Sequence, residues 1–323
     1  MKTVSTALLC LAITGCAAAP DDNDDNDDAA SLVAATGREF DVAALPARLA
    51  PGDLVRHGQI AALVPPPGEG VTGEALHRDG TADELTVRTD FDGAVTVTTE
   101  ASQPPEDLAP VASGKCTDPR YALFDYRWDT TLEWSFKASS TPNQGGQTLP
   151  VAWAEDQIRK GGQNIVNAHN DCGRADHVSA TINYLGRTTL GVNVTASGTC
   201  GTRDGHSVVA FADFNGNAPE NLIAATCTYT QQGHGDGRIT AVESDIRLQR
   251  YNVIYWYTGS CDEFAGDLYF DLQSVMTHER GHSFGLAHAV NSPNLTMYPE
   301  IEYCDRGDAT LGLGDMLGLE AIY

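Results

Sequence analysis

The chain has 323 residues, which is enough for one well-packed domain and a smaller module. It carries 44 acidic against 20 basic residues, for a formal charge of -24. A charge of this sign and size argues against nucleic acid or an anionic lipid surface as a partner, because both would repel it. The sequence makes no prediction of an oligomeric state.

Residues 1–16 have the features of an export signal. A short apolar run at residues 7–13 is too short to span a bilayer and follows a positively charged start. The segment ends in ITGC, which resembles a bacterial lipobox, where the chain is cut before the cysteine and Cys16 is lipidated. The alternative is ordinary signal cleavage among residues 17–19. We therefore expect an exported protein, either an outer-membrane or cell-surface lipoprotein anchored at Cys16 or a secreted one.

Residues 17–30 contain the run DDNDDNDD, which has too much charge and too few apolar residues to fold. We interpret residues 17–30 as a solvated acidic linker. A calcium-binding loop is disfavoured, because the glycine and glutamate of an EF-hand-type loop are missing.

Residues 31–113 form an N-terminal region without cysteine. Its first half is rich in proline and glycine. Residues 84–100 predict a β-hairpin, because alternating strands flank Asp92 and Gly93. Residues 101–110 have the composition of a linker. The region is either a small β module or a propeptide.

Six further cysteines all lie within residues 114–323, which marks this part as one domain. An even number of cysteines in an exported chain predicts three disulfides, whose pairing the spacing leaves open. The six are Cys116, Cys172, Cys200, Cys227, Cys261 and Cys304.

The same domain shows a strand, a helix, several strands and two more helices. Residues 127–137 predict the first strand. Residues 151–171 predict a helix whose inner face carries Trp153, Ile158, Ile165 and Val166, and which Gly161 and Gly162 weaken in the middle. Three more strands are expected at residues 178–186, 207–214 and 238–249.

The most informative stretch contains the pattern H-E-x-x-H-x-x-G-x-x-H. His278 and His282 are four residues apart on a helix and share a face, where two imidazoles can bind one zinc ion. Glu279 lies beside the metal rather than on it. Gly285 allows the chain to turn, so that His288 can supply a third ligand. The full pattern arises by chance in roughly three of a hundred thousand such chains, which disfavours a surface helix that is merely rich in histidine.

This pattern resembles that of the metzincin zinc proteases, and most of all their matrixin branch. The resemblance covers residues 278–288, the turn at Met297 and the tail at residues 313–323, and extends more weakly back to about Arg127. It implies an α+β fold, with a twisted mixed sheet, an active-site helix and a C-terminal helix, preceded here by the small β-rich N-terminal region. It also implies one catalytic Zn²⁺ ion.

The resemblance implies a zinc-dependent endopeptidase that hydrolyses peptide bonds in proteins, using a water on the zinc that a glutamate assists. Protein or peptide substrates follow from that activity. The implied roles are metal ligands for His278, His282 and His288, general base for Glu279, a hydrophobic floor at Met297, and structural support from Gly285 and Asp315.

The alternative is an exported binding or adhesive protein that keeps a protease fold. Arg280 favours it, because the family usually has an apolar residue there, whereas the intact motif favours an enzyme. Matrixin-like enzymes are often kept latent by a propeptide cysteine on the zinc. Cys116 is the one candidate for that role, and a disulfide is the preferred interpretation of it. HGDG at residues 234–237 is interpreted as a turn rather than a second metal site.

Overall fold

The computed structural model describes residues 37–78, 81–99, 114–144, 147–214, 222–233, 238–250, 253–256 and 269–323. The expected export signal, acidic linker, second linker and HGDG turn lie outside these residues. In the described part of the chain, no helix combines the length and apolar character needed to cross a membrane.

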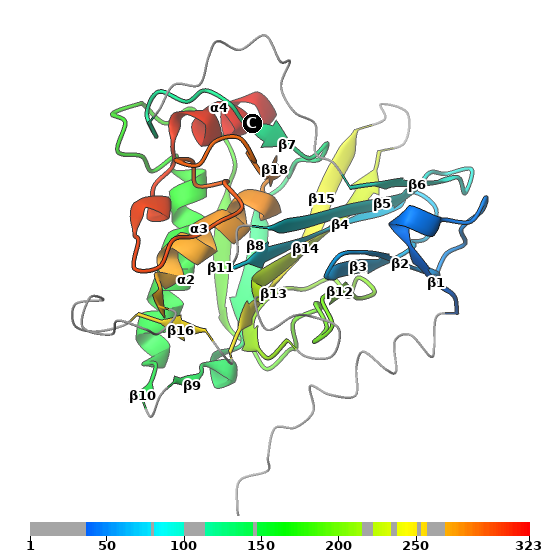
Figure 1. Ribbon diagram of the computed structural model, residues 1–323, viewed down its shortest axis with the longest axis horizontal. Coiled ribbons are helices and arrows are strands. Elements are labelled where there is room, and N and C mark those ends of the chain that lie inside the picture. The colour runs from blue at the N-terminus through cyan, green and yellow to red at the C-terminus, as the bar shows by residue number, and fades with distance from the viewer. Residues whose placement is uncertain are drawn as a thin grey trace, which may run out of the picture.

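An eight-stranded mixed sheet forms the centre of the molecule, in the order β11-β8-β13-β15-β14-β4-β5-β6 (Figure 1). Its C-terminal part contains four parallel strands and β14, which runs antiparallel to β15. These strands are β8 (Leu132–Phe136), β11 (Ile182–Arg187), β13 (Ser207–Ala212), β14 (Leu222–Gln232) and β15 (Ile239–Gln249). The three strands expected after the first helix are confirmed. The first strand begins five positions later than expected, and β14 was not anticipated.

The N-terminal region extends this same sheet. β4 (Glu69–His77) pairs antiparallel with β14, and β5 (Ala82–Thr89) and β6 (Val95–Thr98) follow, also antiparallel. The hairpin around Asp92 and Gly93 is therefore confirmed. β4 was missed, because the sequence before the hairpin was characterised only by its proline and glycine content.

The remaining strands are short. β1 (Glu39–Asp41), β2 (Leu54–His57), β3 (Ile60–Leu63) and β12 (Thr199–Cys200) form a four-stranded sheet, and a 3-10 turn spans Val42–Ala44. Three strand pairs are β7 (Ala122–Leu123) with β18 (Leu286–Ala287), β9 (Asn143–Gln144) with β10 (Gln147–Thr148), and β16 (Ile254–Tyr255) with β17 (Tyr269–Phe270). Further 3-10 turns span Ala138–Ser140 and Gly307–Ala309.

Three α-helices complete the described fold: α2 (Val151–Val166), α3 (Leu272–Ser283) and α4 (Leu313–Ile322). α2 and α3 pack against each other and, with β8, β13 and β15, enclose the main apolar core. Gly161 explains the close approach of these helices, because a Cβ there would lie 2.5 Å from the Cβ of Met276. The helix runs through both glycines without a break, so their function is close packing.

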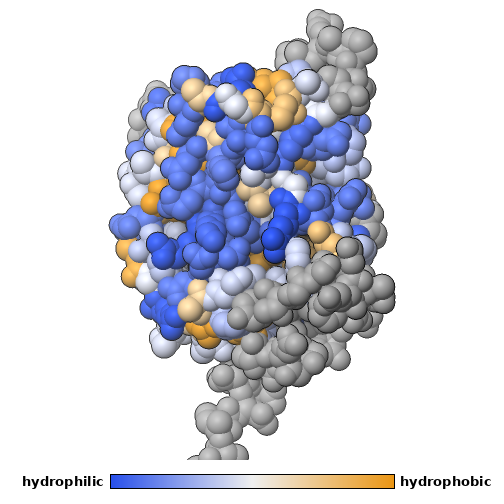
Figure 2. Space-filling view, turned by 90° about the vertical axis from the view of Figure 1, so that its left-hand side faces the viewer, coloured by the Kyte–Doolittle hydropathy of each residue, from blue (hydrophilic) through white to orange (hydrophobic). Residues whose placement is uncertain are grey.

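The outer face of α2 is polar and its inner face is apolar. Ile158, Ile165 and Val166 are buried as expected, whereas Trp153 is half-buried. Figure 2 shows the side of the molecule that lies on the left of Figure 1, where α2 runs, and its surface is mainly hydrophilic with apolar residues in small separate areas. The helix is therefore amphipathic and packs on the core through one stripe.

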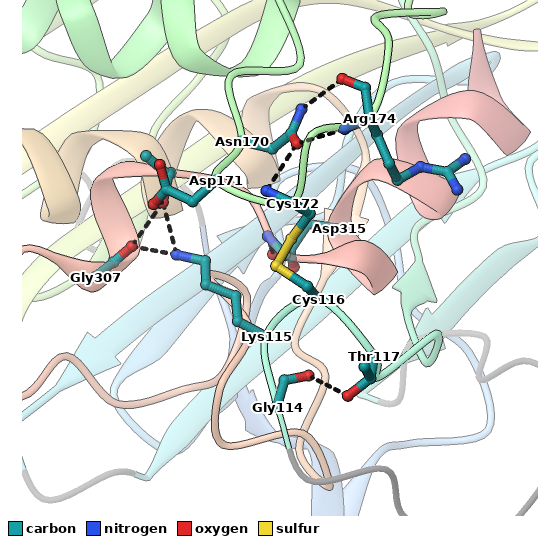
Figure 3. The surroundings of a disulfide bond; sticks show 12 residues. Gly114, Lys115, Cys116, Thr117, Asn170, Asp171, Cys172, Arg174, Gly307 and Asp315 are labelled. Atoms are coloured by element: carbon teal, nitrogen blue, oxygen red, sulfur yellow. Dashed lines mark hydrogen bonds between the residues drawn. A yellow bond between two sulfur atoms is a disulfide. The ribbon is translucent and has the colours of Figure 1, made fainter.

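Disulfides join segments of the C-terminal part. Cys200 pairs with Cys227, and Cys304 is also disulfide-bonded, whereas Cys261 lies outside the described residues. Cys116 pairs with Cys172 in the loop after α2 (Figure 3). The disulfide expected for Cys116 is confirmed, and its alternative role as an inhibitory metal ligand is wrong, because its sulfur is already bonded.

Candidate metal centre

α3 places two histidines of the motif on one face, one turn apart. The helix starts at a defined point, because the Asp271 side chain accepts a hydrogen bond of 2.9 Å from the Ser274 backbone amide. It ends at Ser283, two residues before Gly285, whose φ is +94°. A side chain at Gly285 would meet the Tyr126 carbonyl, since a Cβ there would lie 2.7 Å from that oxygen. The turn then sends the chain back towards α3 through β18.

This reversal brings the third histidine of the motif to the other two. The Nε2 atom of His278 lies 3.0 Å from Nε2 of His282 and 3.1 Å from Nε2 of His288. All three rings are buried. The three nitrogens therefore surround one point.

The opposite nitrogen of each ring faces an oxygen acceptor. These acceptors are the Thr296 carbonyl, 2.7 Å from His278 Nδ1, the Leu286 carbonyl, 2.9 Å from His282 Nδ1, and Glu84 Oε1, 2.9 Å from His288 Nδ1. A proton on Nδ1 of His278 and of His282 satisfies the two carbonyl acceptors and leaves each Nε2 with a lone pair, whereas the short contact of His288 Nδ1 with Glu84 lacks the geometry of a hydrogen bond. Acceptors of this kind orient metal-binding histidines in proteins.

The three imidazoles fit a zinc ion. Lone pairs that face one another at these separations repel, unless a cation lies between them. Tetrahedral zinc with Zn–N bonds of about 2.0–2.1 Å spaces its nitrogens by about 3.3 Å, close to the observed distances. Burial also keeps two of the rings neutral, as ligands must be: it lowers the pKa of His278 to about 3 and that of His282 well below its usual value.

Glu279 follows His278 on α3 and is fully buried. The Thr226 hydroxyl on β14 donates a hydrogen bond to Glu279 Oε2. Burial raises the pKa of Glu279 to about 7, although the Thr226 bond opposes this shift. A carboxyl whose pKa lies near neutrality can both accept and return a proton.

Met297 lies directly beneath α3. A Cβ at Gly281 would collide with the Met297 sulfur, so this glycine lets the methionine approach the helix. The Asp315 carboxylate accepts hydrogen bonds from the backbone amides of Thr296 at 3.0 Å, Met297 at 3.2 Å and Gly312 at 2.8 Å. Because the Thr296 carbonyl also faces His278, Asp315 connects α4 to the histidine cluster.

Arg280 points away from the three histidines. Its guanidinium carbon lies 4.6 Å from the centre of the Trp134 ring, and the side chain is fully buried. The apolar position expected from the family resemblance is therefore filled by an arginine stacked on an aromatic ring. The departure from an apolar residue at this position is therefore accommodated inside the core.

A fourth side chain, which the sequence analysis missed, completes the cluster. Glu74 on β4 lies with His278, His282 and His288 in a group whose ligand atoms are all within 4.8 Å of one another. Its two carboxylate oxygens lie 3.5 Å from Nε2 of His282 and 3.5 Å from Nε2 of His288. The sequence around Glu74 contains no signal for this position, because Val71 and Ala75 lie on one face of the strand and Thr72 and Glu74 on the other, a pattern that predicts an exposed carboxyl.

The comparisons with known proteins agree with this geometry. Residues 124–323 match the model of the family described as Matrixin. Since the match covers more than half of the chain, the protein belongs to the matrixin family, whose members are zinc-dependent metallopeptidases. The α+β fold agrees with that membership. A search of curated proteins returns no match.

Proposed function

We propose that the chain is a zinc-dependent endopeptidase that cleaves peptide bonds within proteins. The observation that carries this proposal is the convergence of three buried imidazoles, next in the chain to the buried carboxyl of Glu279. His278, His282 and His288 hold the metal, and Glu279 is the general base. Family membership supports the metallopeptidase class, and the site supplies the residues for it.

Zinc, when bound, supplies a Lewis acid that acidifies a water molecule and polarises the carbonyl of the substrate. Side chains of the protein transfer the proton and position the base. Glu279 takes the proton from the water as it attacks and returns it to the departing amine. The Thr226 hydroxyl holds the Glu279 carboxyl in place through Oε2. Buried surroundings exclude bulk water, so these polar contacts act in a medium of low dielectric constant.

The test measures the amount of bound zinc and the cleavage of a protein substrate separately. The full chain is loaded with zinc, and cleavage of unfolded casein is measured before and after limited nicking with an immobilised glutamate-specific protease, which can cut after Glu106 between the N-terminal region and the matched domain and is then removed. We expect about one zinc per chain and casein cleavage in the nicked protein. Glu279→Ala, treated identically, should keep the zinc and lose nearly all cleavage.

A different ligand set would contradict the proposal. His288→Ala should lose zinc affinity along with activity. Full zinc occupancy in this variant would mean that the third ligand is another residue, and unchanged cleavage by Glu279→Ala would mean that the base is another residue.

We also propose that the protein is exported. The disulfides Cys116–Cys172 and Cys200–Cys227 support this proposal, because such bonds persist in oxidising compartments. Lipid attachment at Cys16 would anchor it to an outer membrane or cell surface. Labelled fatty acid should enter the wild-type protein in bacterial cells and not Cys16→Ser; equal labelling of both would remove the anchor from the proposal.

A further inference from the structure

β14 is the last strand that the C-terminal part of the chain contributes to the sheet. Its outer edge pairs with β4 of the N-terminal region. The two strands pair antiparallel from Leu222 opposite His77 to Gln231 opposite Glu69. β14 also touches the active-site helix, since Thr226 bonds to Glu279. Without β4, β14 would be an open strand edge beside the metal centre, where an extended peptide can add as a further strand. β4 therefore occupies the position at which a substrate chain could pair.

Glu74 stands at the point of β4 nearest the metal centre. It lies directly opposite Thr226 on β14 and directly opposite Glu84 on β5. These three residues form a row across three strands. Thr226 contacts Glu279, Glu74 lies against the histidines, and Glu84 lies against His288.

The surroundings of Glu74 point to a cation. The residue is 1% exposed, and neither carboxylate oxygen makes a hydrogen bond of ordinary geometry among the described residues, although the Glu279 carboxyl lies next to it. A carboxylate is stable at such a place when it is paired with a positive charge or coordinates a metal. Its polar neighbours include His288 and also His282, whose Nδ1 faces the Leu286 carbonyl so that its Nε2 carries a lone pair rather than a proton. A metal ion bound by Glu74 and by these nitrogens gives the buried carboxylate and the imidazoles a common partner.

Glu84 gives the N-terminal region a second connection to the site. Its Oε1 atom accepts a hydrogen bond of 2.8 Å from the His288 backbone amide and lies 2.9 Å from His288 Nδ1. β5 thereby orients the third histidine while β4 faces the metal position. Two neighbouring strands of one region are fitted to the same site.

We propose that β4 blocks the substrate position and that Glu74 is the fourth ligand of the metal, so that the chain is latent while residues 37–99 remain docked. This proposal rests on the proposed function of the site. Zinc with three histidines and one carboxylate has a filled coordination sphere, whereas a catalytic zinc needs an open position for water. Release of β4 frees that position and the edge of β14 together.

The test uses the full chain loaded with Co²⁺ in place of zinc, because the visible spectrum of Co²⁺ reports its ligands. Acetohydroxamate, a small metal chelator, serves as the probe. Glu74→Gln removes the negative ligand while keeping its shape. Glu69→Gln is the matched control, because it removes the same charge from the far end of β4. His278→Ala tests the metal centre itself.

We expect the spectrum of Glu74→Gln to differ from that of the wild type and the spectrum of Glu69→Gln to match it. Acetohydroxamate should bind Glu74→Gln at least ~10-fold more tightly than the wild type, because a ligand that must displace Glu74 binds in proportion to the open fraction. Glu74→Asp, whose carboxylate is one methylene shorter, should bind the probe with intermediate affinity. It also provides a second variant if Glu74→Gln does not fold.

Identical spectra and probe affinities in wild type, Glu74→Gln and Glu74→Asp would overturn the assignment of Glu74, and the proposed peptidase would stand. Two other results would instead overturn the metal centre on which both proposals rest. One is a wild-type protein that does not bind Co²⁺ stoichiometrically, and the other is a His278→Ala variant with the wild-type spectrum.

Discussion

Thr226 on β14 and Glu279 on α3 are joined by a hydrogen bond from the threonine hydroxyl to Glu279 Oε2. This bond connects the central sheet to the proposed general base. Because the bond favours the ionised carboxyl, it opposes the effect of burial on the pKa of Glu279. The position of the base therefore depends on a strand that lies far from the motif in sequence.

Replacing Thr226 by valine should remove this bond with little change in shape. Hydrogen bonds to charged groups contribute about 1.5–3 kcal/mol, so kcat of the nicked enzyme should fall roughly 10- to 100-fold. Thr226→Ser keeps a hydroxyl and is the control. A Thr226→Val enzyme with unchanged kcat would show that the bond does not position the base.

Asp315→Ala should destabilise the turn at Met297. Three buried backbone amides lose their acceptor, at Thr296, Met297 and Gly312, and each unsatisfied group costs about 1–3 kcal/mol. Zinc affinity should fall as well, because the Thr296 carbonyl faces His278. Denaturant unfolding and chelator competition measure both effects. Glu300→Ala, an exposed position in the same loop, should change neither.

Gly161→Ala tests the packing of α2 on α3. Helix propensity alone would make alanine more stable by about 1 kcal/mol. The added Cβ lies 2.5 Å from Met276 Cβ and 2.7 Å from the Met276 carbonyl carbon, so we expect a net loss of about 1–3 kcal/mol. Gly162→Ala should cost less, because its Cβ is crowded by the flexible tip of the Ile182 side chain and meets Arg280 only at ordinary contact distance. Equal or higher stability of Gly161→Ala would mean that the helices can move apart freely.

Gly73→Val tests the docking of β4. A Cβ at Gly73 would lie 2.7 Å from Ile60 Cγ1 on β3 and 2.8 Å from Cys200 Sγ on β12, so valine should disrupt the packing of β4 on the four-stranded sheet. We expect cleavage of casein by the full chain without nicking. Gly191→Ala, which has open space around it, is the control. A Gly73→Val protein that stays folded, binds zinc and remains inactive would argue against latency through β4.

Removal of zinc should lower the stability of the folded chain. A ligand that binds only the native state contributes about 2.7 kcal/mol at a hundred times its dissociation constant, so a chelator should lower the unfolding midpoint. Glu279→Ala should respond as the wild type does. His282→Ala, which lacks one ligand, should respond much less, and an equal response would place the metal elsewhere.

The sequence alone was sufficient for the parts of the site that are local in the chain. Helix periodicity places His278 and His282 on one face and Glu279 next to that face. Gly285 predicts the turn that brings His288 back. The structure has that turn, with φ of +94° at Gly285. Local rules succeed here because the contacts span only a few residues.

Strand pairing explains what the sequence did not predict. Glu74 meets the histidines only because β4 pairs with β14, and no local pattern encodes which strands become neighbours. β14 itself was overlooked, because most of its residues are buried and the alternation of a half-exposed strand is absent. Gly161 and Gly162 were predicted to weaken a helix, whereas helix packing determined their function.

A crystal structure of the zinc-loaded full chain would test the central claim most directly. We predict anomalous density for one zinc ion between the Nε2 atoms of His278, His282 and His288, with an oxygen of Glu74 about 2.0–2.2 Å from it. Zinc bound there with Glu74 turned away and β14 unpaired would contradict latency through β4. Absence of zinc from the three histidines would contradict the account of the site as a whole.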